Sequence, residues 1–191
     1  YEEERLSNRQ FGSTRSGIAP FYADKHAKTG IQISELYDEP SLREKVRGLV
    51  AVKNVLLEHL YQKAPIDADE LMAQLHAWGE WVRPYLVDTF SFLREAMGQG
   101  RNILLEGQLG ALKDPDFGIY PFVTSTSTLA GFATVGAGIP PTAFSEIIAV
   151  TKAYSSAVGA GAFVSEIFGA PAEELRRRGG DAGEYGATTG R

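Results

Sequence analysis

The clearest pattern in the chain is a helical spacing of apolar residues that begins at Ser41. Ser41 and Glu44 stand three residues apart, which is the spacing of a capping box and predicts the start of a helix. The apolar residues that follow recur every three or four positions: Leu42, Val46, Leu49, Val52, Leu56 and Leu60. Asp67 with Glu70 predicts a second helix through Val82. Pro84 should kink it or begin a third helix, which we place at 85–97.

The rest of the chain favours short strands and ordered loops. Apolar runs predict strands at 31–36, 102–106 and 158–167, and glycines mark loops at 11–20 and 107–141. Thr142 can cap a helix through 153, and a short helix over 173–178 should end at Gly179–Gly180. We therefore divide the chain into a nucleotide-binding loop and short strand at 1–40, a helical subdomain at 41–100, and a strand and loop portion at 101–191, all within one incomplete domain.

Composition narrows the class of protein. With 191 residues, 43% of them hydrophobic, the chain can bury a core. A net charge of −5 without a basic stripe excludes nucleic acid as an expected partner, and no apolar run is long enough to span a membrane, so we expect a cytoplasmic protein. The absence of cysteine excludes thiolate chemistry. His26 lies in a polar loop, where a solvated surface role is favoured over acid–base chemistry, and His59 and His76 fit helix surfaces.

Several motifs combine residues suited to anions or cations, each with a simpler structural interpretation. Glu106–Gly110 and Gly136–Gly138 allow close backbone approach to a phosphate, but they also fit tight turns and match no complete nucleotide fingerprint. The hydroxyls of Thr124–Thr128 suit a phosphate or a polar loop. Asp114 and Asp116 favour a turn over a hard cation, and Arg176–Arg178 favours an interaction with a helix dipole.

Taken together, these segments resemble the adenylosuccinate synthetase family, in the same order and at similar spacing over nearly the whole chain. The matching segments are Gly12–Thr14, Gly17–Lys25, Leu105–Gly110, Asp114–Ser125, Gly136–Pro141, Lys152–Ser155, Val158–Gly161 and Gly183–Arg191. A joint match of this length is far more specific than any single motif. The resemblance implies an α/β fold, of which this chain is an incomplete, helix-rich middle portion of a P-loop-NTPase-like three-layer enzyme.

The resemblance implies a ligase of purine and AMP biosynthesis. Such an enzyme uses GTP and Mg²⁺ to join IMP and L-aspartate into adenylosuccinate through 6-phosphoryl-IMP, and it works as a homodimer with a shared IMP site. The family's base aspartate and acid histidine are expected upstream of this chain, and its guanine-recognition segment downstream. We therefore predict no catalytic residue and no metal ligand within these residues, and no turnover by them alone.

The resemblance also assigns binding residues. Those expected to bind IMP are Thr14, Lys28, Gln108, Leu109, Thr124 and Arg191, and those expected to bind aspartate are Ala187, Thr188, Thr189, Gly190 and Arg191. Lys28 stands where the family commonly has an arginine that reaches the other subunit's IMP. Gln108–Leu109 departs from the usual Ala-Gln pair, and Arg15–Ser16 from the usual Gly-Arg pair. The small residues of the 186–191 loop predict poor packing until substrate orders it.

Two alternatives stay open. The altered Gln108–Leu109 pair fits a related GTP-dependent ligase that acts on another purine nucleotide. The missing base and acid fit a non-catalytic module that binds a purine nucleotide or takes part in assembly.

Overall fold

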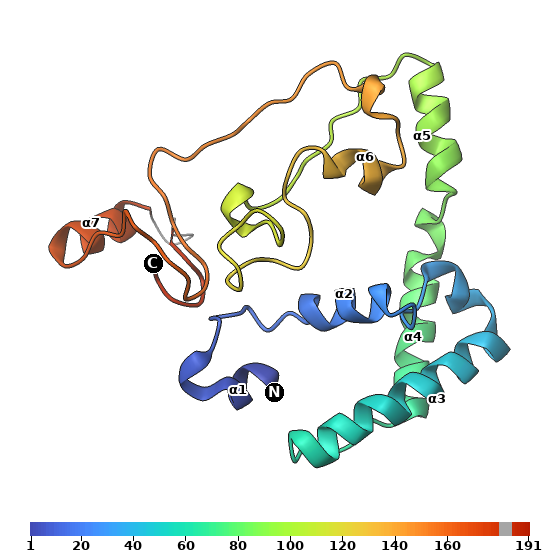
Figure 1. Ribbon diagram of the computed structural model, residues 1–191. Helices are drawn as coiled ribbons and strands as arrows, with labels where there is room; N and C mark the ends of the chain where they lie inside the picture. Colours follow the sequence, from blue (N-terminus) through green and yellow to red (C-terminus); the bar gives the residue numbers. More distant parts are fainter. Residues whose placement is uncertain (180–184) are drawn as a thin grey trace. The chain divides into compact units, whose positions relative to one another are not determined.

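The computed structural model describes residues 1–179 and 185–191, which form two compact units (Figure 1). Unit 1 comprises Tyr1–Arg5 and Gly17–Thr89, and unit 2 comprises Leu6–Ser16 and Phe90–Arg191. The domain limits that we place at residues 40 and 100 remain a prediction. None of the described helices is both long enough and apolar enough to cross a membrane.

Unit 1 is built from helices. They are α1 (Glu2–Leu6, all but its last residue), α2 (Ile18–His26), η2 (Ile33–Tyr37), α3 (Glu39–Val55), η3 (Leu56–Leu60), α4 (Ala68–Val82) and η4 (Arg83–Tyr85). Here η2 and η4 are 3₁₀ helices, and η3 is a π-helical continuation of α3. The loop predicted at 11–20 therefore ends at Gly17, and α2 occupies its last three residues from Ile18 onward.

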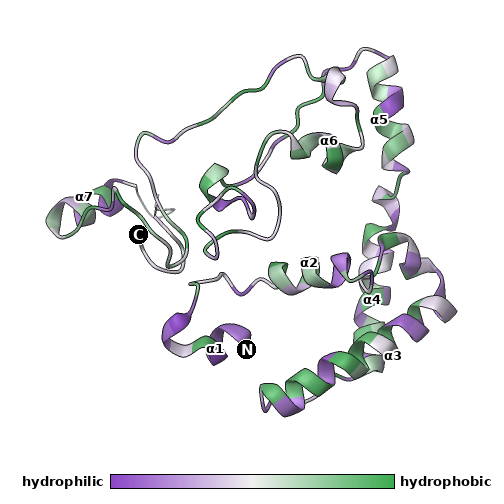
Figure 2. Cartoon of the chain, viewed as in Figure 1, coloured by the Kyte–Doolittle hydropathy of each residue, from purple (hydrophilic) through white to green (hydrophobic). Residues whose placement is uncertain are grey.

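The core of unit 1 lies between α3 and α4. Leu42, Val46 and Val50 of α3 are buried with Met72 of α4, and Leu36 of η2 packs against them. Figure 2 shows the apolar residues of both helices in green. The three buried residues of α3 are four positions apart, so they form one stripe along the helix. The predicted amphipathic helix is confirmed, and burial of this stripe fixes how α3 and α4 pack.

The helix starts were predicted partly correctly. Asp67 caps α4 as expected, with its carboxylate accepting from the N–H groups of Asp69 at 2.8 Å and Glu70 at 2.9 Å. The capping box at Ser41 is wrong. Asp38 precedes it in non-helical backbone and accepts from the Ser41 N–H at 3.3 Å, so α3 begins at Glu39.

The third helix, predicted at 85–97, begins later. It is α5 (Thr89–Gly98). Pro84 instead lies in the single 3₁₀ turn of η4, which follows α4 directly. A proline that lacks an N–H fits the first turn of such a helix, so the break falls at Pro84 and the next helix needs a new start.

The three predicted strands are wrong, because the described residues contain no strand ladder. At 31–36 the chain turns into η2, whose start is closed by Gln32 and Glu35: the Gln32 N–H donates to the Glu35 carboxylate at 2.6 Å. The segments 102–106 and 158–167 form no regular element, since a strand needs a neighbour to accept its backbone hydrogen bonds. The helix predicted at 142–153 is reduced to η6 (Pro141–Ala143), because Ile147, Ile148 and Val150 are β-branched and favour helix weakly.

Unit 2 contains shorter elements. Besides most of α5, they are η1 (Ser7–Arg9), η5 (Ala111–Lys113), α6 (Phe132–Ala137), η6 and α7 (Ala170–Arg178). Helix α7 confirms the predicted C-terminal helix and starts three residues earlier. Gly179 is its C-cap, whereas Gly180, Gly183 and Glu184, which belong to the predicted motifs, lie outside the described residues.

Unit 2 buries little apolar surface. Among its described residues Ala172 is the one buried hydrophobic residue, whereas Leu104 is 87% and Val150 94% exposed. Burial of apolar area is the dominant favourable term in folding. Hydrogen bonds between loops must therefore carry most of the order of unit 2.

This contrast predicts different amide protection in the two units. Amides of α3 around Val46 should exchange slowly, because their opening disrupts the apolar core. Amides at 144–153 should exchange at nearly the rate of an unfolded peptide, because neither helix nor strand protects them. Hydrogen–deuterium exchange of the 191-residue chain, read by mass spectrometry, measures both segments in one sample. Equal protection of the two would contradict this account of where stability resides.

Candidate functional site

Three segments of unit 2 meet at glycines that leave no room for a side chain. The N–H of Ala160 donates to the carbonyl of Phe11 at 2.8 Å. A Cβ placed on Gly12 would lie 2.9 Å from the Cα of Gly159, and one on Gly186 would lie 1.9 Å from the Ala157 carbonyl oxygen. Only glycine permits these approaches. The loops at 11–14, 157–161 and 186–191 are therefore interlocked through their backbones.

The 186–191 loop is closed on itself and anchored to both neighbours. The Gly190 N–H donates to the Gly186 carbonyl at 2.7 Å, and the Gly186 N–H to the Arg191 carbonyl at 2.8 Å. The Thr188 hydroxyl donates to the Gly12 carbonyl at 2.7 Å, and the Thr189 hydroxyl to the Ala157 carbonyl at 3.2 Å. The expected poor packing holds for the exposed residues Ala187, Thr188 and Thr189, whereas the backbone of the loop is held in place because its small residues let neighbouring backbones approach closely.

Arg191 is held by a carboxylate on one side and by carbonyls on the other. Its Nε and Nη2 form a bidentate pair with Glu166, with Nη2 to Oε2 at 2.7 Å and Nε to Oε1 at 2.9 Å. Nη1 donates to the carbonyls of Gly159, Ala160 and Gly161 at 3.2, 2.9 and 2.8 Å. The hydrogen bonds from Arg191 lower the pKa of Glu166. These contacts fix the position of the guanidinium.

Asp114 organises the loop that follows Gly110. Its buried carboxylate accepts from the Ser127 hydroxyl at 2.7 Å and from the N–H groups of Asp116, Thr128 and Phe117 at 3.0, 3.0 and 3.2 Å. These hydrogen bonds, that from Ser127 first, lower the pKa of Asp114 to about 2. The favoured interpretation of Asp114 as a turn residue is confirmed, since both its oxygens are engaged by donors.

The hydroxyl run at 124–128 is largely used inside the protein. Thr126 is buried and its hydroxyl contacts the side-chain amide of Gln108, while the Thr128 hydroxyl donates to the Gly110 carbonyl at 2.8 Å. The N–H of Thr124 donates to the Lys113 carbonyl at 2.9 Å. The polar-loop interpretation of this run therefore holds for Thr126, Ser127 and Thr128.

The two residues that depart from the family pattern differ in environment. The Gln108 amide turns inward to Thr126, whereas Leu109 is 66% exposed and has a left-handed φ of 57°. A leucine in that conformation is strained, because its Cβ crowds the backbone. Leu109 therefore presents an apolar side chain on a constrained turn next to Gly110.

The remaining predicted site residues lie in loops or at helix ends. Thr14 is exposed, with its hydroxyl 2.9 Å from that of Ser16, and it belongs to unit 2 with the three interlocked loops. Lys28 belongs to unit 1, where it follows α2 with a φ of 64° and donates its N–H to the Lys25 carbonyl at 3.1 Å. The structure thus brings Thr188, Thr189 and Arg191 together and places Gln108 beside Thr126.

The histidines and the arginine run fit mainly structural roles. His26 ends α2 beside Tyr22, with ring centroids 6.3 Å apart, His59 lies in η3, and His76 of α4 pairs with Glu39. Arg177 and Arg178 pair with Glu174 on α7. Arg176 differs, because its Nε donates to the Gly190 carbonyl at 2.8 Å.

Sequence reasoning missed two charged residues that hold the loops. Glu166 is one. Lys113 is the other: its Nζ donates to the carbonyls of Phe122 and Val158 at 3.1 Å each, which ties the 108–128 loop to the 157–161 loop. Burial and then the positive charge of Arg191 lower the pKa of Lys113. No spacing signal could reveal either residue, because their partners are distant in sequence.

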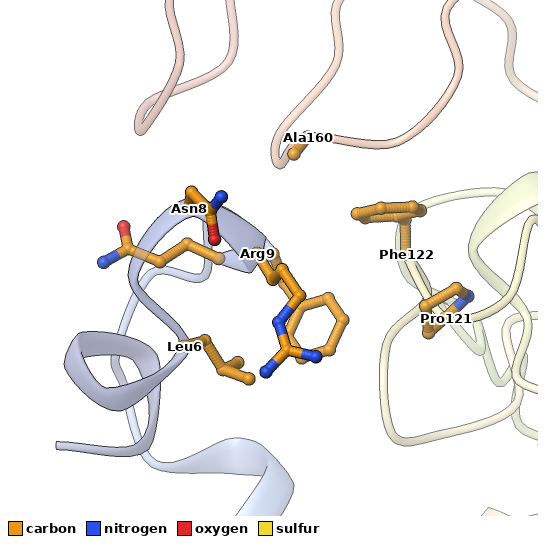
Figure 3. A pocket seen from close by; sticks show the side chains of 8 residues that line it. Leu6, Asn8, Arg9, Pro121, Phe122 and Ala160 are labelled. Atoms are coloured by element: carbon orange, nitrogen blue, oxygen red, sulfur yellow. The ribbon is translucent and has the colours of Figure 1, made fainter.

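Two cavities open in unit 2. One, of about 440 Å³, lies beside η1, and its lining includes Leu6, Asn8, Arg9, Pro121, Phe122 and Ala160 (Figure 3). The other, of about 300 Å³, is lined partly by Glu166, Arg176 and Arg191, together with Tyr154 and Phe163. The second cavity therefore brings charged groups to the end of the 186–191 loop.

Comparison with known proteins shows which family this chain resembles. A family model described as adenylosuccinate synthetase matches residues 1–191. The adenylosuccinate synthetase of Gloeobacter violaceus is 44% identical over all of this chain, which covers 42% of that protein, and that of Thermomicrobium roseum is 42% identical, with 44% of it covered. A solved structure, fully ligated adenylosuccinate synthetase from Plasmodium falciparum, matches the whole chain with a TM-score of 0.85 at 29% identity, over 43% of that chain.

The fold is that of an α/β synthetase, of which these residues form a helix-rich part, so the predicted fold class is confirmed. The chain belongs to the adenylosuccinate synthetase family. It spans less than half the length of the relatives that it matches.

The environment of Asp114 predicts a pH dependence of stability. Its pKa is lower in the folded protein than in the unfolded chain, so its contribution is present above about pH 4 and is lost as the pH falls to about 2. Asp114→Asn should lower the melting temperature at pH 7 and flatten its decline between pH 4 and 2. Asp116→Asn is the matched control, which should keep the wild-type profile. Parallel profiles for wild type and Asp114→Asn would disprove this role.

Proposed function

We propose that this chain supplies the IMP- and aspartate-holding part of a GTP-dependent ligase that joins IMP and L-aspartate into adenylosuccinate. The observation that carries the proposal is the interlocked loop cluster, which ends in a charged, planar guanidinium at Arg191. A fork of this kind suits a carboxylate or the oxygens of a nucleotide. The names of the relatives and of the solved structure support this function for the longer polypeptide.

In this proposal the chain's residues bind and orient the substrates. Thr14 and Thr124 contact the phosphate region of IMP, Gln108 and Leu109 lie near the nucleotide, and Arg191 helps to hold it. Ala187, Thr188, Thr189, Gly190 and Arg191 hold aspartate. Fixing both substrates makes the attack of the amine effectively unimolecular. The acid and base that move protons are expected elsewhere in the polypeptide, so these residues alone should show no turnover.

The proposal includes GTP and Mg²⁺ because the family implies them. The described residues offer few groups that could bind either one. Asp114, the best acidic candidate, has both oxygens engaged by N–H and O–H donors. The described residues contain no group of three or more histidine, aspartate or glutamate side chains placed to hold a metal ion. The resemblance to the family implies metal ligands in other parts of the polypeptide, where the ion would offset charge on the transferred phosphoryl group.

A second candidate function rests on Gln108 and Leu109. With the Gln108 amide at Thr126 and an apolar side chain at Leu109, this turn offers the nucleotide a different set of groups from an Ala-Gln pair. GTP-dependent ligation of another purine nucleotide would fit this different set of groups. Competition between purine nucleotides in an assay of the family-length protein separates the two ligases. A family-length protein without any nucleotide-dependent ligation would favour the non-catalytic module.

Arg191 gives the direct test of the proposed site. In the family-length protein, Arg191→Leu should lower kcat/KM for aspartate by about 2–4 kcal/mol in transition-state terms, the scale of losing one buried charged partner. Steady-state formation of adenylosuccinate at varied aspartate and IMP measures the effect. Arg177→Leu, on the exposed face of α7, is the matched control and should behave as wild type. Unchanged aspartate and IMP dependence in Arg191→Leu would remove this residue from the site.

Lys28 tests the proposed homodimer. If it reaches the IMP phosphate of the partner subunit, Lys28→Ala should raise the IMP requirement strongly and Lys28→Arg only slightly, since charge matters more there than geometry. Lys25→Ala, three residues earlier on α2, is the control. Mixing Lys28→Ala subunits with subunits disabled at Arg191 should restore activity above both unmixed samples. Activity that merely tracks the unmixed samples would show that the site is not shared.

A further inference from the structure

The cavity of about 300 Å³ holds two arginines and one glutamate. Glu166 pairs with Arg191, with side-chain exposures of 16% and 21%. Arg176 lines the same cavity and donates to the Gly190 carbonyl, whereas its neighbours Arg177 and Arg178 share Glu174. Within residues 1–179 and 185–191 no carboxylate pairs with Arg176. The described lining residues therefore carry two positive charges and one negative charge.

Arg191 has no bidentate face left for a ligand. Nε and Nη2 are both taken by Glu166, and Nη1 donates to three carbonyls of the 159–161 turn. A guanidinium has five N–H donors in a fixed plane, so a second carboxylate can reach the fork only where the first one leaves. One N–H of Nη2 has no partner among the described residues, but a carboxylate that takes the Nε and Nη2 pair of Arg191 in the bidentate mode must displace Glu166.

A displaced Glu166 needs another cation, because an unpaired carboxylate in a half-closed site is costly. Arg176 is the candidate. It lines the same cavity, and its charge already adds to the lowering of the pKa of Glu166, after the larger effect of Arg191. Its Nε is anchored at Gly190, and its two terminal nitrogens, which form no hydrogen bond within residues 1–179 and 185–191, can receive a carboxylate.

We propose that Glu166 is an exchangeable carboxylate: it occupies Arg191 until a substrate carboxylate takes its place, and Arg176 then receives it. This inference rests on the proposed function, since it names how the amino-acid carboxylate enters that site. It assigns Glu166 and Arg176 as positioning residues that act through Arg191. The competing interpretation is a permanent Glu166–Arg191 pair with a structural role alone.

Calorimetry of L-aspartate binding distinguishes the exchange from a permanent Glu166–Arg191 pair. The titration uses the family-length protein with IMP present. Exchange predicts that Glu166→Gln tightens the Kd for aspartate by roughly three- to tenfold, because the internal competitor loses its charge. Arg176→Gln should weaken binding by a similar factor, because Glu166 then has no second partner. In the double variant that carries both Glu166→Gln and Arg176→Gln, the weaker binding caused by Arg176→Gln should disappear, because Arg176 acts only on the charged Glu166.

Controls make each outcome decisive. Glu173→Gln and Arg177→Gln carry the same charge changes on α7 outside the cavity lining and should leave the Kd unchanged. Glu166→Asp, which keeps the charge on a shorter stem, should tighten binding less than Glu166→Gln, and it serves where the glutamine variant fails to fold. Weaker or unchanged binding in Glu166→Gln overturns the exchange, as does an Arg176→Gln penalty that persists in the double variant.

The same titration distinguishes failure of this inference from failure of the proposed function. If Arg191→Leu abolishes aspartate binding and Glu166→Gln does not tighten it, the exchange is wrong and the proposed site stands. If aspartate binds equally well to Arg191→Leu, the proposed site is wrong, and the exchange falls with it.

Discussion

Unit 2 depends on backbones that approach more closely than any Cβ allows. Gly186 lies against the Ala157 carbonyl and Gly12 against Gly159, so the loops interlock where side chains are absent. Glycine normally costs conformational entropy on folding. Here its use is steric, because a methyl group at either position would separate the segments. The glycine-rich composition of these loops is therefore a requirement of packing, and their order follows from it.

Where backbones approach closely, carbonyl oxygens lie near one another. Positively charged side chains donate hydrogen bonds to these oxygens. Arg191 faces three carbonyls of the 159–161 turn, and Lys113 bridges those of Phe122 and Val158. Asp114 performs the reverse function, since its carboxylate collects backbone N–H groups and a hydroxyl. Each charge takes the place that an apolar side chain would have in a conventional core. Unit 2 is ordered by polar contacts of this kind.

Unit 1 follows the opposite principle. The stripe of Leu42, Val46 and Val50 packs with Met72, and charged pairs such as Lys45–Glu35 at 2.5 Å and Lys53–Asp24 at 2.7 Å lie at its margins. These pairs are only partly buried, so solvent still weakens them, and burial of the apolar stripe is the larger contribution. The two units therefore differ in what holds them. Residues proposed to bind substrate occur mostly in the unit whose polar groups are already arranged around charge.

The sequence by itself determined the two long helices of unit 1, α3 and α4, because apolar residues at every third or fourth position and the cap at Asp67 are local signals. It also determined the family, through motifs that match together. The tertiary structure decided what local patterns cannot encode. Apolar runs at 102–106 and 158–167 do not become strands where no neighbour pairs with them. The backbone of the 186–191 loop is held in place because Gly186 lies against Ala157, and Glu166, 25 positions from Arg191, carries no sequence signal of its contact with Arg191. Hydrogen bonds between distant segments arise only once the chain is folded, so their partners are visible in the structure alone.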